Sequence, residues 1–322
     1  MFAAGRTVSR QTISFLPLGA DIALDGICNL PNDQEVEARV AEPESTLVAA
    51  TRKFHWKPAR AWFRSLELGA YETARVKLEA PALDLGCGDG SVASTLMSRG
   101  ILECSSVWGI DYDASVLTSA QSESVYSGLA RGDVRQLPFR DAAFQSIVTN
   151  GVLGGVADAE KGCREVARVL RPGGMFAATV PTDRFIDTLL WPRVLAHVSR
   201  RAAHRYVERF NRRLDHLTDY PSSTEWRDRW ERNGLIVDRI EGFLSGRAGG
   251  IYNVLAMHLF RFFGLLRGAP RTLQMAIAFG LRMALHRAYL REISSASRPG
   301  YVLIVGHRKA SDALHPEEGG AE

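Results

Sequence analysis

Short apolar runs alternate with helix-length stretches between residues 82 and 180, and this alternation is the clearest pattern in the chain. Helical stretches at 91–99 and 160–170 separate the runs, and an Arg-Pro-Gly-Gly sequence at 171–174 predicts a turn before the last run. Buried strands joined by helices form βαβ units, whose strands are parallel. The pattern therefore predicts an α/β protein with strands at 82–85, 107–110, 147–149 and 175–180.

The chain beyond Pro181 is less regular, but it contains further elements of the same kinds. A long helical insertion at 250–293 is rich in apolar residues. It separates two more predicted strands. The elements expected in this half are helices at 189–213 and 224–233, and strands at 235–240 and 301–306.

Composition narrows the class of protein. A chain of 322 residues that is 46% hydrophobic can bury a sizeable core. Its 40 basic and 36 acidic residues give a formal net charge of +4, which indicates a mixed surface, and we expect no nucleic-acid partner. The four cysteines lie far apart without a C-x-x-C pair, so neither a zinc site nor a disulfide framework is expected. Such cysteine usage fits a cytoplasmic protein.

The strongest chemical signal is the sequence Asp-Leu-Gly-Cys-Gly-Asp-Gly at 84–90, which follows the first predicted strand and precedes a helix. Glycines at such a turn let the backbone approach a ligand closely. The helix that follows would favour an anion or a carboxylate at its amino end. A dinucleotide-binding loop would need glycine at position 91, where the chain has Ser91, and this disfavours a nicotinamide-dependent dehydrogenase.

Four motifs occur in a fixed order along the chain. They are D-L-G-C-G-x-G at 84–90, an acidic residue that closes the second strand at Asp111, G-D-x-x-x-L-P-F at 132–139 and L-R-P-G-G at 170–174. On these motifs the chain resembles the class I S-adenosylmethionine-dependent methyltransferases, of the small-molecule kind similar to methyltransferase type 11. The resemblance implies a Rossmann-like, doubly wound sheet of seven strands, mostly parallel with the last one antiparallel, and S-adenosylmethionine as the cofactor.

The resemblance also divides the chain into parts. We expect one methyltransferase domain at 46–310, with the helical insertion at 250–293 before the last strand. The expected parts are a disordered leader at 1–45, a helical lead-in at 46–80, a cofactor-binding core at 81–181, a substrate-side half at 182–310 and a loose tail at 311–322.

Ten residues are implied by the resemblance to bind the cofactor. Asp84 would contact its ammonium group, and Asp111 would accept hydrogen bonds from both ribose hydroxyls. Asp133 and the Val134 backbone would meet the adenine, while Asn150 would lie beside the sulfonium. The full set is Asp84, Gly86, Cys87, Gly88, Gly90, Asp111, Tyr112, Asp133, Val134 and Asn150, in which the glycine loop holds the methionine portion.

Methyl transfer to oxygen benefits from a general base, and His216 is the first candidate because histidine titrates near neutral pH. Asp215 or Asp219 could orient it, and Tyr220 is a second candidate. A lone histidine is more often structural, so that interpretation stays open.

The insertion and the arginine-rich stretch at 193–213 each permit several interpretations. The uncharged runs of the insertion fall short of the roughly 20 residues that span a bilayer. The insertion could be an apolar cap over the substrate, a set of interfacial helices on a membrane, or a packed subdomain or dimer interface. The arginines could receive phosphate groups or anionic lipid, or form a solvated helix face.

We therefore expect an enzyme, in the cytoplasm or peripheral at the inner face of the membrane, that methylates a small, apolar or lipid-linked acceptor. Oxygen is slightly preferred as the acceptor atom. The alternative is C-methylation of an isoprenoid or quinone-like acceptor. An alternative of another class is a non-catalytic module that keeps the cofactor fold and binds a partner or a membrane surface. No metal is required for either reaction, because the work of the protein is alignment and desolvation.

Overall fold

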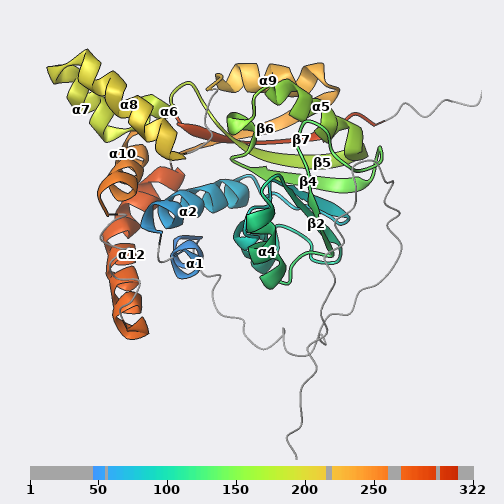
Figure 1. The fold of residues 1–322 in the computed structure, drawn as a ribbon, viewed down its shortest axis with the longest axis horizontal. Coiled ribbons are helices and arrows are strands. Elements are labelled where there is room, and N and C mark those ends of the chain that lie inside the picture. Colours follow the sequence, from blue (N-terminus) through green and yellow to red (C-terminus); the bar gives the residue numbers. More distant parts are fainter. Residues whose placement is uncertain (1–45, 55–56, 215–219, 260–269, 295–297, 311–322) are drawn as a thin grey trace, which may run out of the picture.

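The computed structural model describes residues 46–54, 57–214, 220–259, 270–294 and 298–310 (Figure 1). Strands in this part of the chain form one seven-stranded sheet in the order β3-β2-β1-β4-β5-β7-β6. Neighbouring strands are parallel except at β7, which is antiparallel to both β5 and β6. The predicted fold class is confirmed. The strands are β1 Ala82–Leu85, β2 Val107–Asp111, β3 Gly128–Arg131, β4 Phe144–Asn150, β5 Leu170–Pro181, β6 Leu235–Phe243 and β7 Tyr301–Arg308.

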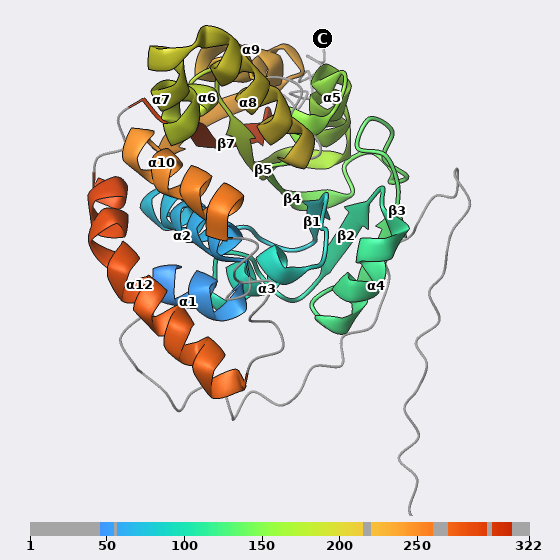
Figure 2. The ribbon, with the colours of Figure 1, turned by 60° about the vertical axis from the view of Figure 1, so that its left-hand side comes forward.

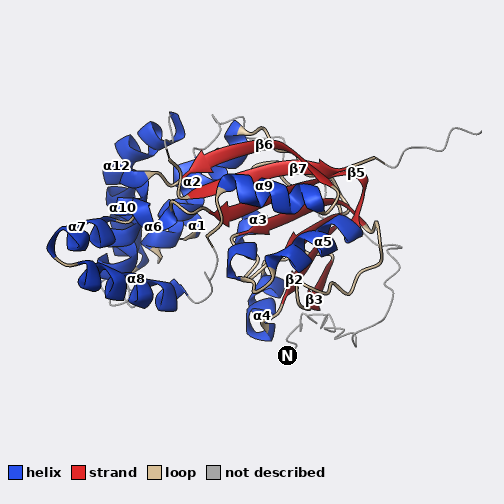
Figure 3. Ribbon diagram, turned by 90° about the horizontal axis from the view of Figure 1, so that it is seen from above, coloured by secondary structure: helices blue, strands red, loops and turns tan. Residues whose placement is uncertain are grey.

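Helices cover both faces of the sheet, with α5 and α9 on one side and α1 to α4 on the other (Figure 3). The α-helices are α1 Thr46–Lys53, α2 Pro58–Thr73, α3 Ser91–Ser98, α4 Ala114–Ser122, α5 Ala159–Val169, α6 Phe185–Thr188, α7 Leu190–Val198, α8 Arg200–Leu214, α9 Ser223–Arg232, α10 Gly246–Val254 and α12 Arg271–Ser294. Two short elements complete the set, the 3-10 helix η2 at Leu153–Gly155 and the π-helical turn η3 at Leu255–Leu259.

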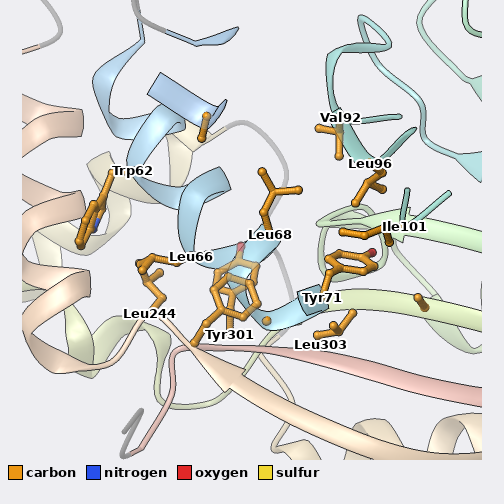
Figure 4. Close-up of a cluster of buried hydrophobic side chains, with 14 of the residues drawn as sticks. Trp62, Leu66, Leu68, Tyr71, Val92, Leu96, Ile101, Leu244, Tyr301 and Leu303 are labelled. Carbon is orange, nitrogen blue, oxygen red and sulfur yellow. The ribbon is translucent and has the colours of Figure 1, made fainter. Parts of the chain in front are cut away.

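Two hydrophobic cores sandwich the sheet. In the first, Trp62, Leu66 and Tyr71 of α2 pack with Leu96 of α3 and Leu303 of β7 (Figure 4). In the second, side chains of α5 and α9 pack on the opposite face of the same strands. Burial on both faces explains why these strands are continuous apolar runs in the sequence.

Five helices, α6, α7, α8, α10 and α12, gather beyond the carboxyl ends of the parallel strands, and we call them the helical end (Figures 1 and 2). Helix α10 contacts α6, α7 and α12, and α12 also packs along α1 and α2. The arginine-rich stretch and the insertion therefore belong to one group of helices, placed at the edge of the sheet where βαβ proteins bind their ligands.

Most predicted elements agree with the structure to within a few residues, but three predictions need correction. The single helix predicted at 189–213 is wrong, because Ser199 has extended backbone angles of φ −159° and ψ 118° and separates α7 from α8. Strand β3 was not predicted. Strand β5 begins at Leu170, ahead of the predicted turn. Leu170 pairs with Phe144 of β4 and the next pair is Met175 with Ser146, so residues 171–174 lie outside the regular pairing between the two strands. The expected leader at 1–45 and tail at 311–322 lie outside the described residues.

Helix α9 is fixed to the end of β5 by one buried hydrogen bond. Trp226 is fully buried, and its Nε1 donates to the Pro181 carbonyl oxygen at 2.8 Å. A capping box at Ser222 and Glu225 begins the helix and sets its direction. Trp230, one turn later, is equally buried, but its Nε1 has no hydrogen-bond partner in the described part of the chain. The two tryptophans thus differ in polar contact and not in burial.

We expect Trp226→Phe to lower the free energy of unfolding more than Trp230→Phe, by about 1–2 kcal/mol, since only the first change removes a buried hydrogen bond. Both variants lose the same ring volume, so Trp230→Phe is the matched control. Urea unfolding followed by circular dichroism measures the difference. Equal losses in the two variants would show that the Pro181 bond adds nothing.

Candidate active site

The glycine loop, residues 86–90, leaves the carboxyl end of β1 and enters α3. Gly86, Gly88 and Gly90 have φ angles of +75°, +54° and +75°, a region that favours glycine. A Cβ on Gly86 would lie 2.2 Å from Val152 Cγ2, whereas a Cβ on Gly88 would meet no atom within 4 Å. The loop is therefore tightly packed at its start and open at its middle, where a ligand has room to approach the backbone.

Asp111, at the end of β2, is held against this loop by its own carboxylate. Its Oδ2 accepts from the Gly88 N–H at 2.9 Å, and its Oδ1 accepts from the Asp113 N–H at 3.0 Å. The next side chain, Tyr112, is exposed. Asp113 caps α4 by accepting from the Ser115 N–H at 2.8 Å.

Asp84 is the buried carboxylate of the loop region. Its Oδ2 accepts from the Tyr126 hydroxyl at 2.6 Å. Burial raises the pKa of Asp84 to about 6, against the opposing effect of the Tyr126 hydrogen bond. Burial also raises the pKa of the Cys87 thiol, which favours its protonated form near neutral pH. Tyr126 lies in the segment before β3, and no sequence motif predicts its place beside Asp84.

The segment predicted to meet adenine lies beside the same edge. The Gly132 N–H donates to the Asp111 carbonyl oxygen at 3.0 Å, which ties this segment to the end of β2. Val134 is partly buried against the second core. The Asp133 carboxylate accepts from the Arg135 backbone at 2.8 Å and pairs with the Arg135 guanidinium at 2.5 Å, and these bonds lower the pKa of Asp133. An amine would therefore have to compete with Arg135 for this carboxylate.

The comparisons with known proteins agree with this geometry. A family model described as a methyltransferase domain matches residues 83–178. A demethylmenaquinone methyltransferase of Staphylococcus aureus (strain JH9) is 28% identical over 195 residues, which cover 57% of this chain and 76% of that protein. The solved structure of a candidate sarcosine dimethylglycine methyltransferase from Galdieria sulphuraria shares the fold, with a TM-score of 0.50, 16% identity, and coverage of 81% of this chain and 98% of that one.

The chain is a class I methyltransferase that uses S-adenosylmethionine as its cofactor. Its motifs lie in the matched region, from β1 to β5, and converge at the carboxyl edge of the sheet. The relative covers more than half of the chain, so the likeness extends beyond the motifs themselves.

Helix α2 of the methyltransferase presents a polar stripe to this edge. Its four members are separated by four, three and four residues, so they share one side of the helix. The stripe consists of Arg60, Arg64, Glu67 and Tyr71. The stripe was not predicted to belong to the site, because polar residues on an amphipathic helix usually face solvent.

The two ends of the α2 polar stripe bind the cofactor motifs directly. Arg60 donates from both terminal nitrogens to the Asp89 carboxylate, each at 3.0 Å, within the glycine loop. Tyr71 donates to Asn150 Oδ1 at 2.8 Å, at the carboxyl end of β4. Helix α2 therefore bridges two of the loops that form the site, and it fixes the orientation of the Asn150 amide.

The centre of the α2 polar stripe is a buried ion pair. Glu67 is 1% exposed, its Oε2 pairs with Arg64, and its Oε1 accepts from Thr179 Oγ1 at 2.7 Å near the end of β5. Arg64 keeps one buried donor, Nε, without a partner among the described residues. The charges of Arg64 and Glu67 balance, so the pair leaves one fixed N–H donor at the edge of the sheet.

Aromatic side chains gather where the helical end meets this edge. Arg64 lies 5.5 Å from the Phe63 ring, and Phe63 packs edge-on against Tyr301 at 4.9 Å between ring centroids. Phe185 stacks on Tyr220 at 5.8 Å and meets Tyr301 at 5.2 Å. We call this group the aromatic cluster, and it consists of Phe63, Phe185, Phe210, Tyr220, Phe243, Tyr252 and Tyr301.

The two candidate bases differ in what the structure describes. Tyr220 belongs to the aromatic cluster, its hydroxyl donates to Asn211 Oδ1 at 2.9 Å, and burial raises its pKa to about 12. Such a hydroxyl stays protonated near neutral pH. His216 and its predicted partners Asp215 and Asp219 lie outside the described residues, between α8 and α9.

We expect Asp111→Ala to lower the affinity for S-adenosylhomocysteine at least about tenfold, because the two carboxylate oxygens expected to accept from the ribose hydroxyls are lost. A tenfold loss of affinity corresponds to about 1.4 kcal/mol. Isothermal titration calorimetry measures the affinity. Asp113→Ala is the control: it removes a helix cap, costing about 1 kcal/mol of stability, and should leave the affinity unchanged. An unaltered affinity in Asp111→Ala would contradict the ribose role.

The affinity for S-adenosylhomocysteine should also depend on pH through Asp84. The raised pKa of about 6 means that the Asp84 carboxylate, the expected partner of the cofactor's ammonium group, is protonated below that pH and ionised above it. Affinity should therefore rise as the pH increases through about 6 and then level off. In Asp84→Asn the affinity should be weaker and lack this step. A pH-independent affinity in the unaltered protein would argue against Asp84 as the ammonium partner.

Proposed function

We propose that the methyltransferase binds S-adenosylmethionine across the carboxyl ends of β1, β2 and β4. Asp84 and the glycine loop, Gly86, Cys87, Gly88 and Gly90, would hold the methionine portion. The open space at Gly88 supports this position, as do the left-handed glycines, which let a ligand approach the backbone.

The remaining cofactor contacts follow the same edge of the sheet. Asp111 would bind the ribose, with the exposed Tyr112 ring beside it. Asp133 and the Val134 backbone would meet the adenine. Asn150, held by Tyr71, would lie beside the sulfonium.

For the acceptor, we propose an apolar, ring-containing molecule, lipid-linked or quinone-like. The observation that carries this proposal is the aromatic cluster, which adjoins the α2 polar stripe through Phe63 and Arg64. Aromatic side chains bind flat apolar rings through stacked and edge-on contacts. The relative from Staphylococcus aureus is named for demethylmenaquinone, which supports an acceptor of the same class.

Bound S-adenosylmethionine supplies a methyl group on a positively charged sulfur, and transfer is an in-line displacement. The protein aligns the acceptor with that methyl group and excludes water. The aromatic cluster would perform both tasks. Arg64 would stabilise negative charge on an acceptor oxygen, because its guanidinium is fixed by Glu67 and its Nε has no partner among the described residues.

A ring carbon is the acceptor atom that we now favour. The carbon beside a ring hydroxyl is nucleophilic once that hydroxyl has lost its proton to solvent, and the spare Nε–H of Arg64 would donate to the resulting oxygen anion. The ring carbon would take the methyl group as the methyl–sulfur bond breaks and S-adenosylhomocysteine leaves, and it would then lose its own proton to solvent. The candidate base Tyr220 has a pKa of about 12, so it would not remove the hydroxyl proton in either reaction, and the preference for carbon rests on the quinone-like class of the proposed acceptor. O-methylation remains the second candidate, favoured by His216, which precedes the aromatic cluster residue Tyr220 in the chain.

The test supplies methyl-labelled S-adenosylmethionine to the purified enzyme with a lipid extract from a strain that lacks the gene. We expect a labelled lipid whose NMR signal is that of a carbon-bound methyl group, and His216→Ala should retain most of the turnover. A methyl ether, with turnover reduced on the order of a hundredfold in His216→Ala, would establish O-methylation. His204→Ala, at an exposed histidine of α8, is the control. Label found only in polar products would overturn the apolar acceptor.

A further inference from the structure

Helix α12 exposes apolar side chains along one side. Phe279, Met283 and Leu290 are 55%, 58% and 46% exposed, and their spacing of four and seven residues places them on the same side of the helix. The opposite side is docked on the protein: Tyr289 meets Thr46 of α1 through their hydroxyls. The helix is therefore anchored by one side and presents an apolar surface with the other.

The charges on α12 are distributed as unevenly as its apolar residues. The Arg282 guanidinium lies 4.9 Å from the centroid of the exposed Phe279 ring, and Arg287 is exposed. The one acidic residue of the helix, Glu292, is buried, and its Oε1 accepts from the Ser245 N–H at 2.5 Å. The outward side of α12 thus combines apolar side chains with positive charge and contains no exposed carboxylate.

Exposed apolar side chains and positive charge also occur together on other helices of the helical end. Helices α7, α8, α10 and α12 together contain twelve arginines, no lysine and two glutamates. Because the whole chain has a formal charge of only +4, the remainder is net acidic. Helix α7 adds Val194 and the 84% exposed Val198. Both α7 and α12 contact α10, so these features lie at one end of the molecule (Figure 2).

We propose that this end of the methyltransferase docks on an anionic lipid bilayer. Phe279, Met283 and Leu290 would enter the boundary between headgroups and acyl chains, while Arg282 and Arg287 would meet lipid phosphates. Exposed apolar and basic side chains on one helix surface are the features by which interfacial helices bind anionic membranes. The proposed contact is a peripheral one, and no helix within the described residues is long and apolar enough to cross a bilayer.

Docking at this end would also serve the proposed acceptor. Helix α10 lies between α7 and α12 and contributes Tyr252 to the aromatic cluster. A lipid-linked acceptor could therefore reach the cluster from the membrane without crossing bulk water. This link to the acceptor rests on the proposed function, whereas the docking itself does not.

The experiment measures sedimentation of the full-length protein with vesicles of phosphatidylcholine, with and without phosphatidylglycerol. We expect binding that requires the anionic lipid and weakens as salt is added. The double variant Phe279→Ser, Met283→Ser and the single variant Arg287→Glu should each lower the apparent affinity at least about tenfold. Arg140→Glu makes the same change in net charge at an exposed position between β3 and β4, and it should bind like the unaltered protein.

Two outcomes would overturn the proposal. One is vesicle binding that is unchanged in the double variant or equally reduced in Arg140→Glu. The other is an absence of vesicle binding together with a dimer that the double variant converts to monomer, which would make this surface an interface between copies of the chain. Affinity for S-adenosylhomocysteine, measured on every variant, shows that the fold is retained. It also separates failure of docking from failure of the proposed cofactor site.

Discussion

The buried carboxylate of Glu67 is the constraint on which the carboxyl edge of the sheet depends. A charge that is 1% exposed is stable in a protein only when it is paired, and Glu67 is paired with Arg64 and accepts from Thr179. Loss of one partner from such a buried pair costs about 3–5 kcal/mol, because the other charge remains buried. The pair thereby holds α2 against the end of β5. Only from that position can α2 bring Arg60 to the glycine loop and Tyr71 to Asn150.

The sequence predicts the centre of this fold better than its edges. Strands β1, β4 and β5 are buried on both faces, so each contains a continuous apolar run, and the glycine motif directly follows β1. Strand β3 was missed because it is a four-residue edge strand whose side chains are mostly half-buried, which leaves no apolar run. The break at Ser199 was missed for a related reason: the residues on both sides have helical patterns, and the extended backbone between them has no sequence signal.

The site residues divide in a similar way, into those that local motifs predict and those that depend on contacts between distant segments. The motifs predict the glycine loop and Asp111, which the structure brings to one edge, because these residues act through backbone geometry that the sequence encodes locally. Tyr126 is separated from Asp84 by 42 residues and has no local pattern that connects the two. The α2 polar stripe is visible as a helical repeat, but whether such a stripe faces solvent or a site depends on where the helix packs. Contacts between distant segments decide that, and they appear only in the folded structure.

Strand β7 lies between β5 and β6, although it follows both of them in the chain. Among the described strands, β6 therefore pairs only with β7, along its whole length from Leu235 to Phe243. During synthesis, β6 leaves the ribosome before the strand that will connect it to the sheet, and the whole helical insertion emerges in the interval. Until β7 is synthesised and pairs with it, β5 has one unpaired edge, and unpaired strand edges promote association with other chains. Completion of the sheet is thus a late event in biogenesis, and the segment 244–300 sets how long the nascent chain must wait for it.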